Sequence, residues 1–179
     1  VEALLRWSHA RFGPVRADAA ITLAEDGRLV QALGLRVLEQ ACACKARWNV
    51  HGLARLTMSV NVSPMQLDDH GFADAVADVL RRHGLAPGEL ELEITESQAI
   101  PRDRALDHNM ARLQALGVRV AIDDFGMGHS SVVHLRRFQI HAIKIDGSLT
   151  RDVLTQSTCA DIVRSIAGLA QGRGLEVVA

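Results

Sequence analysis

The stretch DRALDHNMARLQALGVRVAIDD, residues 103–124, sets the pattern from which the fold can be predicted. Apolar residues recur at helical spacing over residues 103–116, and Gly117 follows as the kind of residue that ends a helix. Residues 118–123, VRVAID, are then rich in Val and Ile and short enough for a strand. The strand runs into two adjacent carboxylates, Asp123 and Asp124, which repel each other and need a compensating cation if they are partly buried.

The same order of elements recurs along the chain. We expect further helices at residues 28–47, 72–83 and 158–172, and further strands at residues 3–7, 57–62, 90–95, 141–146 and 175–179. Alternating strands and helices form right-handed βαβ units around a parallel sheet. The residues alone leave two architectures open, an open doubly wound sheet and a (β/α)8 barrel that would hold about six of its eight units. We expect a single α/β domain over residues 1–179.

Composition excludes several classes of function. The chain is 48% hydrophobic with a net charge of −1, which suits a folded domain with a real core. Only 3% of its residues are aromatic and it has no basic excess, so we expect no DNA partner. No apolar run reaches the ~18 residues needed to cross a bilayer. Three cysteines without framework spacing favour reduced thiols and a cytoplasmic location, and a membrane-tethered parent protein stays open.

Polar side chains gather near the carboxyl ends of the expected strands. In a parallel α/β sheet those ends converge on one rim, where chemistry is usually built. Five different strands therefore supply acids, an amide and a lysine to one mouth, with an arginine near the first strand; these residues are Glu2, Arg6, Asn61, Glu93, Glu96, Asp123, Asp124, Lys144 and Asp146.

This inventory indicates metal-assisted hydrolysis. Carboxylate and amide oxygens, with no Cys or His near the carboxyl end of any strand, select Mg²⁺ or Mn²⁺ over zinc. Lys144 suits the orientation of a water or the stabilisation of a developing negative charge, and Arg6 suits a bidentate contact with a phosphate oxygen. Acids, metals and cationic anchors together are typical of phosphodiester hydrolysis by metal-activated water.

Simpler interpretations exist for each residue taken singly. A glutamate near a strand end is most often part of a surface salt bridge, and Asn61 before Val-Ser-Pro can cap a turn. Asp123 and Asp124 can cap a following turn, and Lys144 can extend to the surface. The Gly126-Met127-Gly128 turn can also be half of a dinucleotide-binding fingerprint. The eight histidines show no ligand spacing, and only those at 129 and 134 lie near this turn.

The motifs taken together resemble the EAL domain family of bacterial cyclic di-GMP phosphodiesterases. Glu2-Ala3-Leu4 resembles the signature that names the family. Further motifs follow in family order over essentially the whole chain, namely SVNVSPMQL, LELEITES, AIDDFGMGHSS, AIKID and GLEVVA. The resemblance implies a TIM-barrel-like (β/α)8 variant that hydrolyses cyclic di-GMP to linear pGpG with Mg²⁺ or Mn²⁺.

The resemblance also implies a role for each motif residue. Implied metal ligands are Glu2, Asn61, Glu93, Asp123 and, for a second metal, Asp124. Lys144 resembles the residue that holds the attacking water, and Glu96 the glutamate that anchors the loop after Asp124. Implied substrate contacts are Arg6 and, in the SPMQ segment, Gln66. That loop further implies a homodimer, and the family implies flanking sensory or cyclase domains.

The chain departs from the family pattern in a few places. Met127 and His129 replace a Thr and an aromatic residue of the loop. The sequence ends at Ala179, one position before a further metal-ligating Glu of the family, so we expect a barrel that is incomplete at its ends and a domain truncated at its C-terminus. Two alternatives to an active enzyme stay open: a cyclic di-GMP receptor that does not cleave its ligand, and an unstable open barrel without activity.

Overall fold

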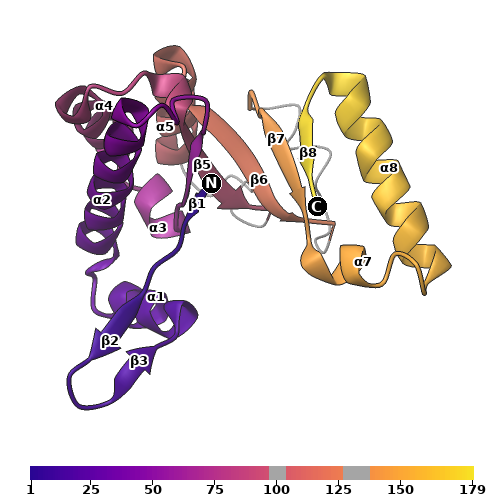
Figure 1. Ribbon diagram of the computed structural model, residues 1–179, viewed down its shortest axis with the longest axis horizontal. Coiled ribbons are helices and arrows are strands. Elements are labelled where there is room, and N and C mark those ends of the chain that lie inside the picture. The colour runs from indigo at the N-terminus through magenta and orange to yellow at the C-terminus, as the bar shows by residue number, and fades with distance from the viewer. Residues whose placement is uncertain (97–103, 127–137) are drawn as a thin grey trace.

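The computed structural model describes residues 1–96, 104–126 and 138–179. Its elements alternate between strands and helices, as the sequence predicts (Figure 1). In chain order they are β1 (Glu2–Ala3), β2 (Trp7–His9), β3 (Gly13–Val15), α1 (Ala17–Asp26), α2 (Val30–Val50), β4 (Met58–Asn61), α3 (Pro64–Leu67), α4 (Phe72–His83), the 3-10 turn η1 (Pro87–Glu89), β5 (Leu90–Thr95), α5 (Arg104–Leu116), β6 (Arg119–Phe125), β7 (Ala142–Ile145), α7 (Gly147–Arg151), α8 (Ser157–Arg173) and β8 (Glu176–Val178).

Six strands form one curled parallel sheet in the order β1-β4-β5-β6-β7-β8. Every pair of neighbours is parallel, so all six carboxyl ends lie at one edge. Helices α2, α4 and α5 cover the outer face on one side and α8 covers it beside β8 (Figure 1). The result is a partial (β/α) barrel, which confirms the predicted fold class.

The residues within each strand divide between the two faces of the sheet. In β5, Leu90, Leu92 and Ile94 are at most 1% exposed and belong to the core under the helices. The intervening Glu91 and Glu93 lie on the inner face, since side chains alternate along a strand. Glu91 pairs with Arg119 near the amino ends of the strands, whereas Glu93 lies nearer the carboxyl ends. On β5 the inner face is therefore charged rather than apolar.

Local sequence signals explain where the helices end. Gly84 and Gly174 follow α4 and α8 with positive φ angles of 62° and 67°, which glycine adopts at little cost. Gly117 has a φ of 84° directly after α5. The position of Gly117 confirms the predicted helix stop, and Gly84 and Gly174 end their helices in the same way. Within the described part of the chain, no helix combines the length and the apolar character that a bilayer crossing requires.

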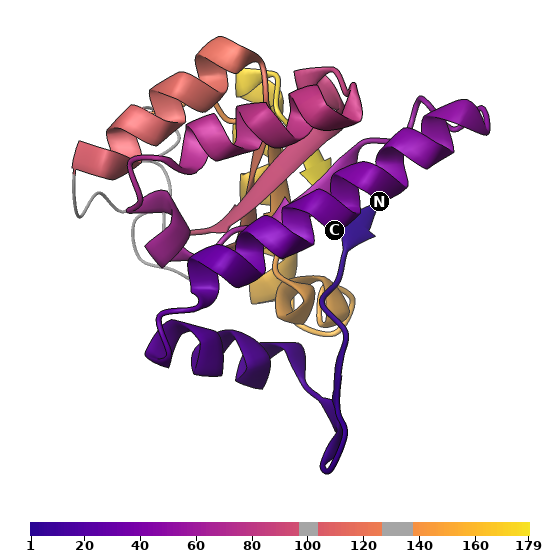
Figure 2. The same ribbon diagram turned by 90° about the vertical axis from the view of Figure 1, so that its left-hand side faces the viewer.

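The prediction of a strand over residues 3–7 is wrong beyond Ala3. The chain leaves the sheet after β1 and forms the β2–β3 hairpin, which projects from the body of the domain together with α1 (Figure 2). Helix α1 was missed as well, although residues 17–26 contain four alanines, and alanine favours helices. The apolar run at residues 3–5 is the reason that the sequence predicts a strand there.

Candidate functional site

The predicted carboxylates meet around one lysine at the carboxyl ends of the strands. The Nζ atom of Lys144 lies 2.7 Å from Glu93 Oε2, 3.3 Å from Glu2 Oε2 and 3.8 Å from Asp123 Oδ1. Asn61 donates a hydrogen bond from Nδ2 to the other oxygen of Glu2 at 2.7 Å. Five neighbouring strands of the sheet, from β1 to β7, each supply one residue to this group. We call it the carboxylate cluster and define it as Glu2, Asn61, Glu93, Asp123 and Lys144.

The burial of the carboxylate cluster is graded. The side chain of Glu93 is 1% exposed, that of Lys144 19%, and those of Asp123 and Glu2 22% and 33%. Lys144 therefore points inward to the acids and does not extend to the surface. The acids can still be reached from solvent on the side of Glu2 and Asp123.

Electrostatics follow from this graded burial. Burial raises the pKa of Glu93, the hydrogen bond and charge of Lys144 oppose that rise, and the charges of Glu2 and Asp123 add to it. Burial acts to lower the pKa of Lys144, but the hydrogen bond to Glu93 and the three surrounding carboxylates raise it above its ordinary value. Lys144 is accordingly an ammonium held among acids, and it is outnumbered by the negative charges that it faces.

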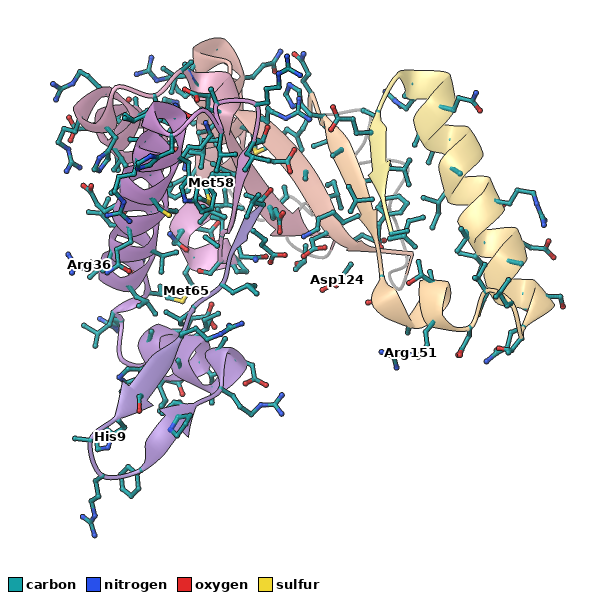
Figure 3. The ribbon with its side chains drawn as sticks, viewed as in Figure 1. His9, Arg36, Met58, Met65, Asp124 and Arg151 are labelled. Carbon is teal, nitrogen blue, oxygen red and sulfur yellow. The ribbon has the colours of Figure 1, made fainter. Side chains whose placement is uncertain are left out.

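Asp124 lies directly beside this cluster, at the open carboxyl end of β6 (Figure 3). Its φ of 53° places a non-glycine residue in the left-handed region, and its backbone N–H donates to Asp123 Oδ1 at 3.0 Å. The register between β6 and β7 shifts at the same place. Burial and the charges of Asp123 and Asp146 raise the pKa of Asp124, with Lys144 opposing them. Strained backbone of this kind is characteristic of functional sites.

Glu96 supports the start of the loop after Asp124. It is 6% exposed and its Oε2 accepts a hydrogen bond from the backbone N–H of Gly126 at 3.2 Å. The backbone N–H of Glu96 donates to the carbonyl of Asp123 at 3.2 Å. Residues 127–137 lie outside the described residues, and with them Met127, His129, His134, the rest of the Gly-rich turn and the predicted dimer contact.

Arg6 and Gln66 lie apart from the carboxylate cluster. Arg6 is exposed, and its Nη1 donates to the carbonyl of Leu5 at 3.0 Å. Gln66 is 8% exposed and its Oε1 accepts from the backbone N–H of Ser63 at 3.1 Å, which caps α3. In the regions that the structure describes, no hydrogen bond or ion pair joins either residue to the cluster.

A cavity of about 290 Å³ adjoins the cluster at Asn61. Its wall is mostly apolar and comes from the start of the chain, α1 and α2, with polar groups at Asn61, Ser63, Gln66 and Thr95. The contribution of α1, through residues such as Ile21, was not foreseen from the sequence. The helical spacing of residues 17–26 is the signal that could have revealed it.

The donor set fits a hard divalent cation, although the described side chains are not arranged around one. No three His, Cys, Asp or Glu side chains among them already surround a common point at metal-binding distance. The ammonium of Lys144 stands between the acids instead, and it leaves part of their negative charge unbalanced. Oxygen ligands with excess negative charge are what Mg²⁺ and Mn²⁺ require.

Comparison with known proteins identifies the family. The family model for the EAL domain matches residues 1–179 of this chain. This chain belongs to the EAL domain family. This chain is 45% identical over 98% of its length to an uncharacterized signaling protein of Caulobacter vibrioides, and it spans 21% of that protein. It is 37% identical over its full length to the bifunctional diguanylate cyclase/cyclic di-GMP phosphodiesterase MucR of Pseudomonas aeruginosa, of which it spans 26%.

The fold agrees with solved EAL structures. The PaMucR phosphodiesterase in complex with c-di-GMP superposes with a TM-score of 0.91 at 36% identity, over 98% of this chain and 71% of that one. The EAL enzyme Bd1971, bound to cAMP and cyclic di-GMP, superposes with a TM-score of 0.90 at 28% identity, over 98% of this chain and 49% of that one. The partial barrel is therefore the family's architecture rather than an open doubly wound sheet.

Proposed function

We propose that this domain is a divalent-metal-dependent phosphodiesterase that hydrolyses cyclic di-GMP to linear pGpG. The observation that carries the proposal is the meeting of Glu2, Glu93 and Asp123, from three different strands, around the ammonium of Lys144. MucR, a relative named as a cyclic di-GMP phosphodiesterase, supports the choice of substrate.

The acids and the amide are the residues that would hold the cations. We assign Glu2, Asn61, Glu93 and Asp123 to one Mg²⁺ or Mn²⁺ and Asp124 to a second one. When bound, such cations lower the pKa of a coordinated water and offset charge on the phosphate oxygens. The raised pKa of Glu93 and of Asp124 is consistent with this assignment, since a nearby cation would favour their charged forms.

Lys144 supplies the ammonium group of the site. Its three acidic neighbours keep it protonated, so it can donate a hydrogen bond to a water or to a phosphate oxygen that gains negative charge during attack. Attack of that water on phosphorus breaks one ester bond of the cyclic dinucleotide and releases a ribose hydroxyl, which gives the linear product. We propose that Arg6, which is exposed, contacts a substrate phosphate and that Glu96 anchors the loop after Asp124.

The adjoining cavity suits part of a nucleotide. Its apolar wall can accept the face of a planar base, while Asn61 and Thr95 on its polar side lie toward the carboxylate cluster. We include Gln66 among the substrate-side residues because it lines this cavity. A base held here would bring its phosphate toward Glu2, which Asn61 contacts.

We also propose where the domain works and which domains accompany it. The chain spans roughly a fifth to a quarter of the curated relatives it matches, with 21% of one and 26% of another. We propose that it works as a single cytoplasmic domain beside sensory or cyclase domains, and that it forms a homodimer through the loop after Asp124.

Chromatographic detection of pGpG tests the proposal. Purified protein containing this domain should convert cyclic di-GMP to pGpG with Mg²⁺ or Mn²⁺, and Glu2→Ala or Asp123→Ala should abolish the conversion. Glu176→Ala is the matched control, because Glu176 is an exposed acid that pairs with Arg119 near the opposite ends of the strands. Unchanged turnover in both site variants would refute the assignment. Calorimetric binding of cyclic di-GMP without any pGpG would instead identify a receptor.

A further inference from the structure

A glycine interrupts helix α2 close to its start. Gly34 lies within α2, which runs from Val30 to Val50, and it is neither a cap nor part of a turn. Glycine inside a helix destabilises the fold relative to alanine, because glycine loses more backbone freedom on folding. A glycine at such a position indicates that another group approaches the backbone of the helix closely.

The group that approaches Gly34 is the side-chain amide of Gln66. A Cβ atom added at Gly34 would lie 2.0 Å from Gln66 Nε2, 2.5 Å from its Cδ and 2.8 Å from its Oε1. Helix α3, which carries Gln66, packs against α2 (Figure 1). The amide therefore lies directly on the backbone of α2, and no side chain fits at position 34 while the amide stays there.

The amide of Gln66 is held from α3 as well. Its Oε1 accepts a hydrogen bond from the backbone N–H of Ser63 at 3.1 Å, and Gln66 is only 8% exposed. Because Oε1 faces an N–H group, exchanging the amide oxygen and nitrogen would bring two donors together. The orientation of the amide is therefore set by Ser63 on one side and by the missing side chain of Gly34 on the other.

Gly34 and Gln66 stand between two cavities. One is the adjoining cavity of about 290 Å³ that reaches Asn61, and the other, of about 240 Å³, lies between α2 and the start of α4. Among the described residues, Gly34 and Gln66 are the two that line both cavities. The pair therefore forms the partition that ends the adjoining cavity on the side of α2.

We propose that Gly34 is a positioning residue for the substrate, which acts by holding the amide of Gln66 in the wall of the adjoining cavity. This inference rests on the proposed function, because it takes that cavity to hold one base of cyclic di-GMP. A side chain at position 34 would displace the amide, which is the end of a flexible side chain, and the helix itself would not need to move. Gly34 thus lowers the helix propensity of α2 but gives the cavity its shape and a polar contact.

The substitution Gly34→Ala separates stability from substrate binding. Better helix propensity offsets the lost hydrogen bond to Ser63, so the Tm should stay within about 4 °C of the wild type. In the pGpG assay KM should rise about threefold to tenfold with little change in kcat, which is the effect of one displaced hydrogen-bonding group. Gly168→Ala is the matched control, because Gly168 lies inside α8 with open space around an added Cβ, and its KM should equal that of the wild type.

A double-mutant cycle shows whether Gly34 acts through Gln66. Gln66→Ala should itself raise KM, and Gly34→Ala should then add nothing, because the amide that it displaces is gone. An unchanged KM in Gly34→Ala or in Gln66→Ala would overturn this inference alone, as would an equal rise in both backgrounds or a large loss of Tm in Gly34→Ala. A protein that binds cyclic di-GMP without making pGpG is compared in the same way by its calorimetric Kd. A wild type that neither binds nor cleaves cyclic di-GMP would overturn the proposed function and this inference together.

Discussion

Replacing Lys144 by methionine removes the one ammonium that the three carboxylates share. Met keeps much of the length and the apolar stem of lysine, so the change deletes mainly charge and hydrogen bonds. Glu93 loses its 2.7 Å partner while it stays 1% exposed, whereas Glu2 and Asp123 keep access to water. The cost should therefore fall almost entirely on Glu93.

The magnitude follows from the type of bond that is lost. A hydrogen bond to a charged group contributes about 1.5–3 kcal/mol, and breaking a fully buried ion pair costs about 3–5 kcal/mol. Because Lys144 is 19% exposed, water partly replaces it and the lower range applies. We expect a loss of about 2 kcal/mol in the free energy of unfolding at pH 7 without metal, which lowers Tm by roughly 4–8 °C for a domain of this size.

The deficit should depend on pH with a definite sign. Burial already raises the pKa of Glu93, and removal of Lys144 raises it further. An acid whose folded pKa lies above its unfolded value of 4.5 stabilises the fold less as pH rises from the unfolded to the folded pKa. The free energy of unfolding of Lys144→Met should therefore differ little from that of the wild type near pH 4. The full loss should be reached at a pH at which Glu93 is ionised in both proteins.

Urea unfolding across this pH range, with EDTA present, measures the effect. The double variant Glu93→Gln with Lys144→Met is the control, because a neutral pair leaves no unpaired charge and should recover most of the lost stability. Equal stability of Lys144→Met and the wild type at pH 7, or a deficit that does not shrink on acidification, would refute the reasoning about Glu93. In the pGpG assay the single variant should lose at least about a hundredfold in kcat, as for a lost stabiliser of developing charge.

Two other regions give predictions of stability. Glu89→Leu should lower the free energy of unfolding by about 3 kcal/mol, because Lys45 is 0% exposed and loses an ion pair of 2.6 Å, with urea unfolding as the measurement. Burial acts to raise the pKa of Glu89, but hydrogen bonds, chiefly from Lys45, lower it below its ordinary value. The contribution of Glu89 to the free energy of unfolding should therefore be present above about pH 4.5 and be lost on acidification. The Glu89→Leu variant should lack this pH dependence. Gly126→Ala should cost about 2 kcal/mol in the same assay, since φ is 107° and the new Cβ would lie 2.7 Å from Leu149 Cδ1. Gly174→Ala, at φ 67° with open space around it, should cost distinctly less, and equal losses would contradict the steric argument.

The elements of the fold were largely predictable because their signals are local. Helical spacing over residues 72–83 and the left-handed glycine after it gave α4 with its observed bounds. The short run of residues 90–95, rich in Leu and Ile, likewise gave β5. The hairpin and α1 were missed because β1 contributes only two residues to the sheet, and where a chain leaves a sheet depends on its neighbours rather than on its own propensity.

The sequence determined which residues reach the carboxyl ends of the strands, because the strand period and the helix stops set where each strand begins and ends. It did not determine how those residues pair. Lys144 and Glu2 are 142 residues apart and meet only because the sheet curls, and Gly34 and Gln66 likewise meet only because α3 packs on α2. Local patterns specify elements, whereas contacts between distant elements depend on the curvature and packing that all the elements create together.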